Sequence, residues 1–177
     1  ERHNVLVADD VFGEAQLDPR LRELGWRALS AIRSPDGTTA YEAKRIALGV
    51  PDLAHDAGAD EVFAGEALLD ELHGVDFQKG CFVGQENVSR MKRRATTRKK
   101  FCPIVFEGEA IAPTTPVLAG EAEIGTVRTG VAGRALALLR LDRALEAIDA
   151  GKSLSTAGRV ARLDAPPWLI LPQRDPA

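Results

Sequence analysis

Short aliphatic runs at the start of the chain predict β-strands. Val5–Ala8 forms one such run, and the stretch LGWRALSAI at 24–32 forms a second. The dipeptide Asp18-Pro19 lies between them and favours a turn, as does SPDG at 34–37. We therefore expect a small sheet in the first 35 or so residues, followed by a change of period.

The next segments carry the 3.6-residue period of helices. TTAYEAKRIALGVP predicts a helix that begins near Thr38 and ends at Gly49, since Pro51 cannot continue it. GEALLDELHG at 65–74 predicts a short amphipathic helix, and GQENVSRMKRRA at 84–95 predicts another with basic residues on its surface.

After about residue 97 the pattern changes to strands. KFCPIVFEG, TPVLAG, AEIGTVRTGVAG, RALALLRL and RVARLDAP are short apolar runs separated by Gly and Pro, and one helical stretch, LDRALEAIDAG, interrupts them. Such a series fits a small antiparallel barrel. We expect an α+β protein with a partial α/β region at 1–96 and a β-barrel domain at 97–177.

Composition narrows the class of protein. The chain has 177 residues, 45% hydrophobic and 28% charged, with a net charge of −3 and two cysteines. That composition is typical of a globular protein, and the cysteines are too few for a disulfide framework, which indicates a reducing, cytoplasmic location. No apolar stretch approaches a membrane span, so we expect no membrane partner.

The segment KGCFVGQE at 79–86 is the part of the chain that packing explains least. Gly80 and Gly84 permit a close backbone approach, and a helix that begins near Gly84 would direct its positive end toward Cys81. Together with Lys79, that dipole favours the thiolate form of the cysteine. The local chemistry suits a reactive thiol, a metal ligand or an anion site, while a lone cysteine is also often a small buried hydrophobe.

KGCFVGQE closely resembles the K-G-C-(Tyr/Phe)-x-G-Q-E signature of the YgfZ family, and YEAKRIALGVP and VSRMKRR resemble the segments on either side of it. These folate-binding proteins are related to the glycine-cleavage T-protein and to mitochondrial factors for iron–sulfur protein maturation, and the family is also linked with tRNA modification. The resemblance implies a tetrahydrofolate-binding accessory factor for iron–sulfur cluster assembly or repair. It also implies a missing N-terminal domain, consistent with a chain that starts at Glu1 within a predicted strand.

The resemblance assigns roles to single residues. Cys81 is the hallmark residue, and Lys79, Gly80, Gly84, Gln85 and Glu86 are the other members of its motif. Tyr41 matches an aromatic that contacts folate, where it would stack on the pterin, and Glu66 resembles the acid that holds the pterin ring. Alternatively, Tyr41 packs at the start of its helix and Glu66 is favoured there by the helix dipole.

Departures from the T-protein weaken a second interpretation, a folate-dependent aminomethyltransferase. The T-protein has R-L-E-A-G where this chain reads Arg45-Ile46-Ala47-Leu48-Gly49, so Ala47 replaces a carboxylate. Whether the chain catalyses any reaction stays open. We expect no metal site within the chain alone, because two cysteines and three scattered histidines lack ligand spacing, although Cys81 could bind metal together with a partner.

The stretch RMKRRATTRKK at 90–100 concentrates basic charge in a net acidic chain. It could hold the polyglutamate tail of folate, an acidic iron–sulfur assembly protein or client enzyme, or RNA, or it could be a solvated helix end. Nucleic acid is the least favoured partner, because no aromatic residues are interleaved for base stacking.

Overall fold

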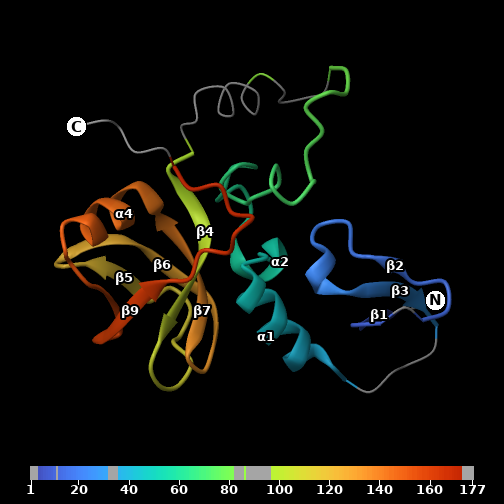
Figure 1. Ribbon diagram of the computed structural model, residues 1–177, viewed down its shortest axis with the longest axis horizontal. Coiled ribbons are helices and arrows are strands. Elements are labelled where there is room, and N and C mark those ends of the chain that lie inside the picture. Colours follow the sequence, from blue (N-terminus) through green and yellow to red (C-terminus); the bar gives the residue numbers. More distant parts are fainter. Residues whose placement is uncertain (1–3, 11, 32–35, 82–85, 87–96, 173–177) are drawn as a thin grey trace.

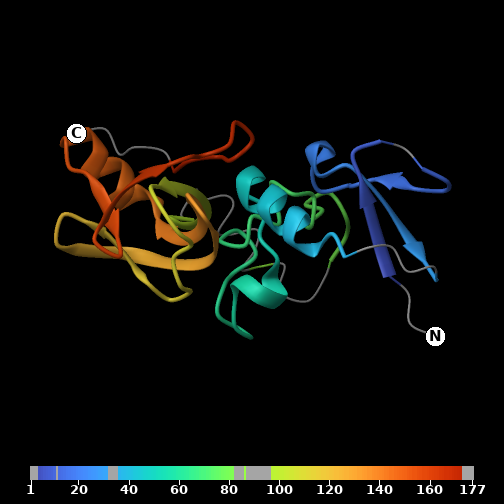
Figure 2. The same cartoon turned by 90° about the horizontal axis from the view of Figure 1, so that it is seen from below.

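The computed structural model describes residues 4–10, 12–31, 36–81, 86 and 97–172. Figure 1 shows a β-barrel on one side, a three-stranded sheet on the other, and two helices between them. Figure 2 shows the molecule rotated by 90°, and the barrel, the helices and the sheet follow one another in the same order along its long axis. The helices therefore separate the sheet from the barrel.

The first sheet has the strand order β1-β3-β2 and is antiparallel. Its strands are β1 (Asn4–Ala8), β2 (Gln16–Leu17) and β3 (Trp26–Ser30), and a short 3-10 helix, Arg22–Leu24, comes directly before β3. The strand predicted at 24–32 is thus confirmed at its centre. Its first residue, Leu24, ends the 3-10 helix instead, and Gly25 at φ 91° separates that helix from the strand.

Helix α1 (Thr38–Leu48) has the predicted bounds. Gly49 ends it in the left-handed conformation at φ 76°, and its N–H donates back to the carbonyls of Arg45 and Ile46. A Cβ on Gly49 would lie 3.1 Å from side-chain atoms of Pro103 and Pro166, so the same glycine allows the barrel to pack closely. A one-turn helix, α2 (Leu53–Asp56), follows, with Asp52 as its N-cap.

The helix predicted at 65–74 is wrong. Residues 64–73 form successive turns, and Leu68 and His73 both have φ near 60°, which no α-helix contains. Contacts from far along the chain explain the difference, since the N–H of Phe101 donates to the carbonyl of Glu66 at 3.2 Å. The apolar residues that suggested a helix, Leu68 and Leu72, are nevertheless buried.

The expected antiparallel barrel is confirmed. Six strands close in the order β4-β7-β6-β5-β8-β9, with β9 paired back to β4. Helix α4 (Leu141–Asp149) connects β7 to β8, as predicted, and packs on the barrel (Figure 1). The strands are β4 (Lys99–Phe106), β5 (Pro116–Ala119), β6 (Ala122–Val131), β7 (Arg134–Arg140), β8 (Leu154–Thr156) and β9 (Arg159–Leu163).

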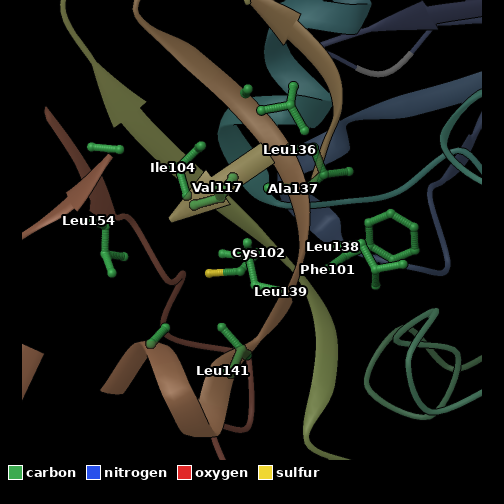
Figure 3. Packing of buried hydrophobic residues seen from close by; sticks show 14 of the residues in the cluster. Phe101, Cys102, Ile104, Val117, Leu136, Ala137, Leu138, Leu139, Leu141 and Leu154 are labelled. Atoms are coloured by element: carbon green, nitrogen blue, oxygen red, sulfur yellow. The ribbon is translucent and has the colours of Figure 1, made fainter. Parts of the chain in front are cut away.

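The barrel interior holds much of the hydrophobic core. Figure 3 shows Cys102, Leu139, Leu141 and Leu154 on one side of the β4–β7 pair, with Phe101 and Leu138 on the other. This alternation follows from the two-residue period of strands, and both sides are buried because the turns at 64–73 and helix α1 cover the outer one. The near-continuous apolar run of β7 therefore reflects burial on both faces.

Strand β6 contains a β-bulge that connects the barrel to the helical region. Its register with β7 shifts between Val127 and Thr129, which leaves Arg128 as the extra residue. Arg128 pairs with Glu61 at 2.5 Å, and the hydroxyl of Thr129 donates to Oδ1 of Asp56. Two successive side chains thus contact the same neighbouring region, which a regular strand would not allow.

Candidate functional site

The segment before the KGC motif is ordered by its own side chains. The Oδ1 atom of Asp76 accepts hydrogen bonds from the N–H groups of Gln78 at 2.8 Å and Lys79 at 3.3 Å. This is the local turn that Asp favours. In Figure 1 the green segment leads away from the helices and the barrel toward the edge of the molecule.

Cys81 itself is exposed and is not in a disulfide. Lys79 and Gly80 beside it are exposed too, and a Cβ on Gly80 would meet no atom within 4 Å. Glu86 is exposed and helical. The other residues of the helix predicted at 84–95, including Gly84 and Gln85, lie outside the described residues. The thiol is therefore accessible to another molecule, and the dipole argument for Cys81 stays a prediction.

The second cysteine differs in every respect. Cys102 is fully buried in the barrel, where its Sγ atom lies among aliphatic side chains (Figure 3). Burial, together with the charge of Asp164, raises the pKa of its thiol to about 12. Because the thiolate is the reactive form, Cys102 is chemically inert in the folded protein. Its role is to pack in the barrel core.

Tyr41 lies on α1, half-buried against the core. Its hydroxyl accepts a hydrogen bond of 2.9 Å from Arg20, and the same guanidinium donates to both carboxylate oxygens of Asp18. Burial would raise the pKa of Asp18, but the hydrogen bonds and charge of Arg20 and the charge of Arg27 lower it. The hydrogen bond to Asp18 raises the pKa of Arg20 in turn, so this pair stays ionised at neutral pH. In the sequence, Asp18 is recognisable only as a turn residue beside Pro19, and no local pattern marks Arg20 as its partner.

Glu66 lies in the turns at 64–73, half-buried. Its Oε2 atom accepts a hydrogen bond of 3.0 Å from the N–H of Phe63, so the side chain stabilises the turn that contains it. The helix-dipole alternative is wrong for Glu66, because no helix begins there. Its role toward folate stays a prediction.

A hollow of about 240 Å³ lies beside the start of α2 and the turns at 64–73, and neither Tyr41 nor Glu66 is among its lining residues. Arg20, which binds Tyr41, and Ala67, which follows Glu66, are on its wall. Its other lining residues are mainly apolar and come from the start of α2 and the turns before the KGC motif: Pro51, Asp52, Leu53, Leu69, Leu72 and Gly74. The hollow is smaller than the usual 300–1,000 Å³ of a small-molecule site, and its wall contains neighbours of the two folate candidates but neither candidate itself.

A buried ion network behind the hollow was not anticipated. Arg45 is fully buried, donates to both carboxylate oxygens of Glu42, and contacts Oδ2 of Asp56 at 2.8 Å. Asp56 also accepts from the N–H of Asp52 at 2.7 Å and from Thr129 of the barrel. The sequence contained one signal for this network, the position of Arg45 on the buried face of a helix, because a buried arginine needs a negatively charged partner. The network holds α1, α2 and β6 together.

Within the described part of the chain, no group of three or more His, Cys, Asp or Glu side chains is arranged to hold a metal ion. The same residues contain no helix of the length and apolarity that crossing a bilayer requires.

Comparisons with known proteins identify the barrel and its relatives. Residues 98–170 match the family described as CAF17, C-terminal beta-barrel domain. The chain is 35% identical over 113 residues to the mitochondrial iron–sulfur cluster assembly factor IBA57 homolog of Neurospora crassa, covering 56% of this chain and 25% of the relative. It is 30% identical over 135 residues to IBA57 of Homo sapiens, covering 69% and 38%, and 37% identical over 99 residues to the homolog of Mycosarcoma maydis, covering 51% and 25%.

These relatives are named as mitochondrial proteins, which overturns the expected cytoplasmic location. The expectation rested on the scarcity of cysteines, and that scarcity argues against an oxidising compartment without distinguishing among reducing ones. The chain spans between a quarter and two fifths of the length of these relatives. Residues 98–170 therefore form a barrel similar to the CAF17 C-terminal domain, in a chain that is similar in sequence to the IBA57 iron–sulfur cluster assembly factors.

Proposed function

We propose that this protein assists the assembly or repair of iron–sulfur clusters in other proteins and that Cys81 is its working thiol. The names of its relatives support the process, and the exposure of Cys81 carries the residue assignment. Of the two cysteines, only Cys81 is accessible to a partner, since Cys102 is enclosed in the barrel.

The chemistry of that thiol follows from its surroundings. The Cys81 thiol loses its proton to solvent, and the thiolate that results is the form that binds iron. Because the described residues offer no ready cluster of ligands, Cys81 would supply one ligand to iron while a partner protein supplies the others. The iron or cluster is then cargo that passes through a shared site. An exposed segment fixed by Asp76 suits such a transient contact.

Tetrahydrofolate is the second element of the proposal. Glu66 would accept hydrogen bonds from the pterin, Tyr41 would contact its ring, and Arg20 would contribute a positive charge to the wall. The mainly apolar lining of the hollow suits a flat heterocycle. At about 240 Å³ it would hold only part of the cofactor, so the remainder would lie against other surfaces.

The role of Cys81 is tested in cells that lack their own factor of this kind. Cells carrying Cys81→Ser should lose the activity of cluster-dependent enzymes, while cells carrying Cys102→Ala should keep it if that variant accumulates to the same level. Equal activity in the two strains would exclude Cys81 as the working thiol. Serine preserves the size of an exposed side chain, so loss of folding is not expected.

Folate binding is tested separately by calorimetric titration of tetrahydrofolate into the protein and into Glu66→Gln and Tyr41→Phe variants. Saturable binding that Glu66→Gln weakens at least tenfold would support a folate site at the turns at 64–73. No binding at millimolar ligand, an affinity weaker than about 4 kcal/mol, would exclude folate from the proposal and leave the thiol role intact. Measurable turnover of an aminomethyl-folate would instead favour a one-carbon transferase.

A further inference from the structure

Three segments that are distant in sequence meet at one lysine. Lys100 is the second residue of β4, and its Nζ atom contacts Oε1 of Glu71, in the turns before the KGC motif. The same Nζ donates to the carbonyl of Ile170 at 3.0 Å, in the segment 164–172 that follows the barrel. Both charged side chains are buried, with 8% of Lys100 and 2% of Glu71 exposed.

Two carboxylate oxygens at this place are buried without a hydrogen-bond partner, Oε2 of Glu71 and Oδ1 of Asp70. Buried carboxylate oxygens are normally hydrogen-bonded, because an unpaired one carries its full desolvation cost. Lys100 provides a single positive charge for two carboxyl groups. The side chains of Asp70 and Glu71 lie within hydrogen-bond reach of each other. A proton on one carboxyl therefore makes that group a donor to the other and removes one of the two negative charges.

We propose that Asp70 and Glu71 form a proton-sharing carboxyl pair that fastens the turns before the KGC motif and the segment 164–172 onto the barrel. With the proton present, one carboxylate faces one ammonium group. When the proton leaves, two negative charges face Lys100 alone, and the contact loosens. The fold thereby contains a pH-sensitive fastening between the barrel and the segment that leads to Cys81.

The electrostatics agree with this geometry. Burial raises the pKa of Glu71 to about 7, and Asp70 adds to the rise while Lys100 opposes it. Among the described residues, the charged groups that act on Glu71 are therefore Asp70 from its own segment and Lys100 from β4, whereas segment 164–172 contributes the uncharged carbonyl of Ile170.

The direction of the pH effect follows from the pKa of Glu71 in two forms, the closed form with its contact to Lys100 intact and the open form with that contact broken. The closed form holds the proton with a pKa of about 7, whereas an opened, hydrated Glu71 has the ordinary value of 4.5. Between those values the open form loses its proton first, so opening becomes easier as the pH rises. The equilibrium for opening should rise by at most about tenfold per pH unit between roughly 5 and 7, and should level off above 7.

Hydrogen–deuterium exchange tests the proposal in the whole chain. After correction for the intrinsic pH dependence of exchange, peptides covering 66–74 and 167–172 should open more readily from pH 5.5 to 7, while peptides of β7 should not. In Glu71→Gln, which keeps an acceptor for Lys100 and a donor for Asp70, the protection of these peptides should become independent of pH. Asp70→Asn should also remove the pH dependence of protection in these peptides, and this variant replaces Glu71→Gln in the test if Glu71→Gln does not fold.

A matched control is Glu61→Gln, since Glu61 also pairs with a basic residue of the barrel but is exposed. That variant should keep the wild-type pH profile of the two peptides. A wild-type profile without slope between pH 5.5 and 7 would overturn the proposal. A slope that persists in both Glu71→Gln and Asp70→Asn would assign the proton to another group and overturn it equally.

Discussion

Removal of the buried charge of Arg45 gives the sharpest test of how the helical region is held to the barrel. In Arg45→Met the chain keeps most of the apolar volume but loses the contacts to Glu42 and to Asp56, the latter at 2.8 Å. The carboxylate of Asp56 has no exposed surface, so it would stay buried with its charge unpaired. Breaking a buried pair in this way costs about 3–5 kcal/mol.

Urea denaturation followed by circular dichroism measures this cost, and thermal unfolding should show a fall of about 6–20 °C for a chain of this size. Arg140→Met is the matched control, because Arg140 pairs with Asp142 at the surface and 39% of its side chain is exposed. That change should cost less than about 1 kcal/mol.

The double variant Arg45→Met with Asp56→Asn separates the buried charge from the lost contacts. Asparagine keeps an acceptor for the N–H of Asp52 but carries no charge. The double variant should therefore be more stable than Arg45→Met alone, with a coupling energy of about 1–3 kcal/mol. A cost below about 1 kcal/mol for Arg45→Met, or strict additivity of the two changes, would contradict the assigned role of the network.

Two further predictions concern the thiols and the barrel. In the native protein a soluble maleimide should label Cys81 within minutes and leave Cys102 unmodified until denaturant is added. Mass spectrometry of digested samples measures the labelling of each cysteine. Labelling of both at similar rates would contradict the enclosed position of Cys102. Gly125→Ala should destabilise the fold by several kcal/mol, because Gly125 has a φ of 156° and an added Cβ would lie 2.1 Å from the carbonyl oxygen of Leu138. A thermal unfolding midpoint within 2 °C of the wild type would refute that contact.

Local signals explain where the sequence predicted the fold correctly. Helix α1 was predicted because its stop at Gly49 lies in the sequence itself, and α4 and most barrel strands follow from periodicity and turns. The segment 65–74 was predicted wrongly because its apolar spacing fits a helix while contacts with β4 impose turns. Strand β8, with three residues, is too short to give a periodic signal.

The candidate site was predictable only in part, for the same reason. The motif around Cys81 is contiguous and can be recognised directly. The pairs Arg45–Asp56 and Glu71–Lys100 join residues 11 and 29 positions apart, and Thr129 reaches Asp56 across 73. Nothing in one sequence states which charges meet across such separations, so these buried groups became visible only when the segments were assembled.

The bulge in β6 has a consequence for how such chains can diverge. Because Arg128 is the extra residue that lets Thr129 reach Asp56, the strand tolerates many substitutions more easily than the loss of a single position. A one-residue deletion there would restore regular pairing and turn one of the two contacts away from the helices. The length of this strand should therefore stay constant among relatives that keep the buried aspartate, and relatives that have lost the aspartate are the ones in which insertions and deletions should accumulate.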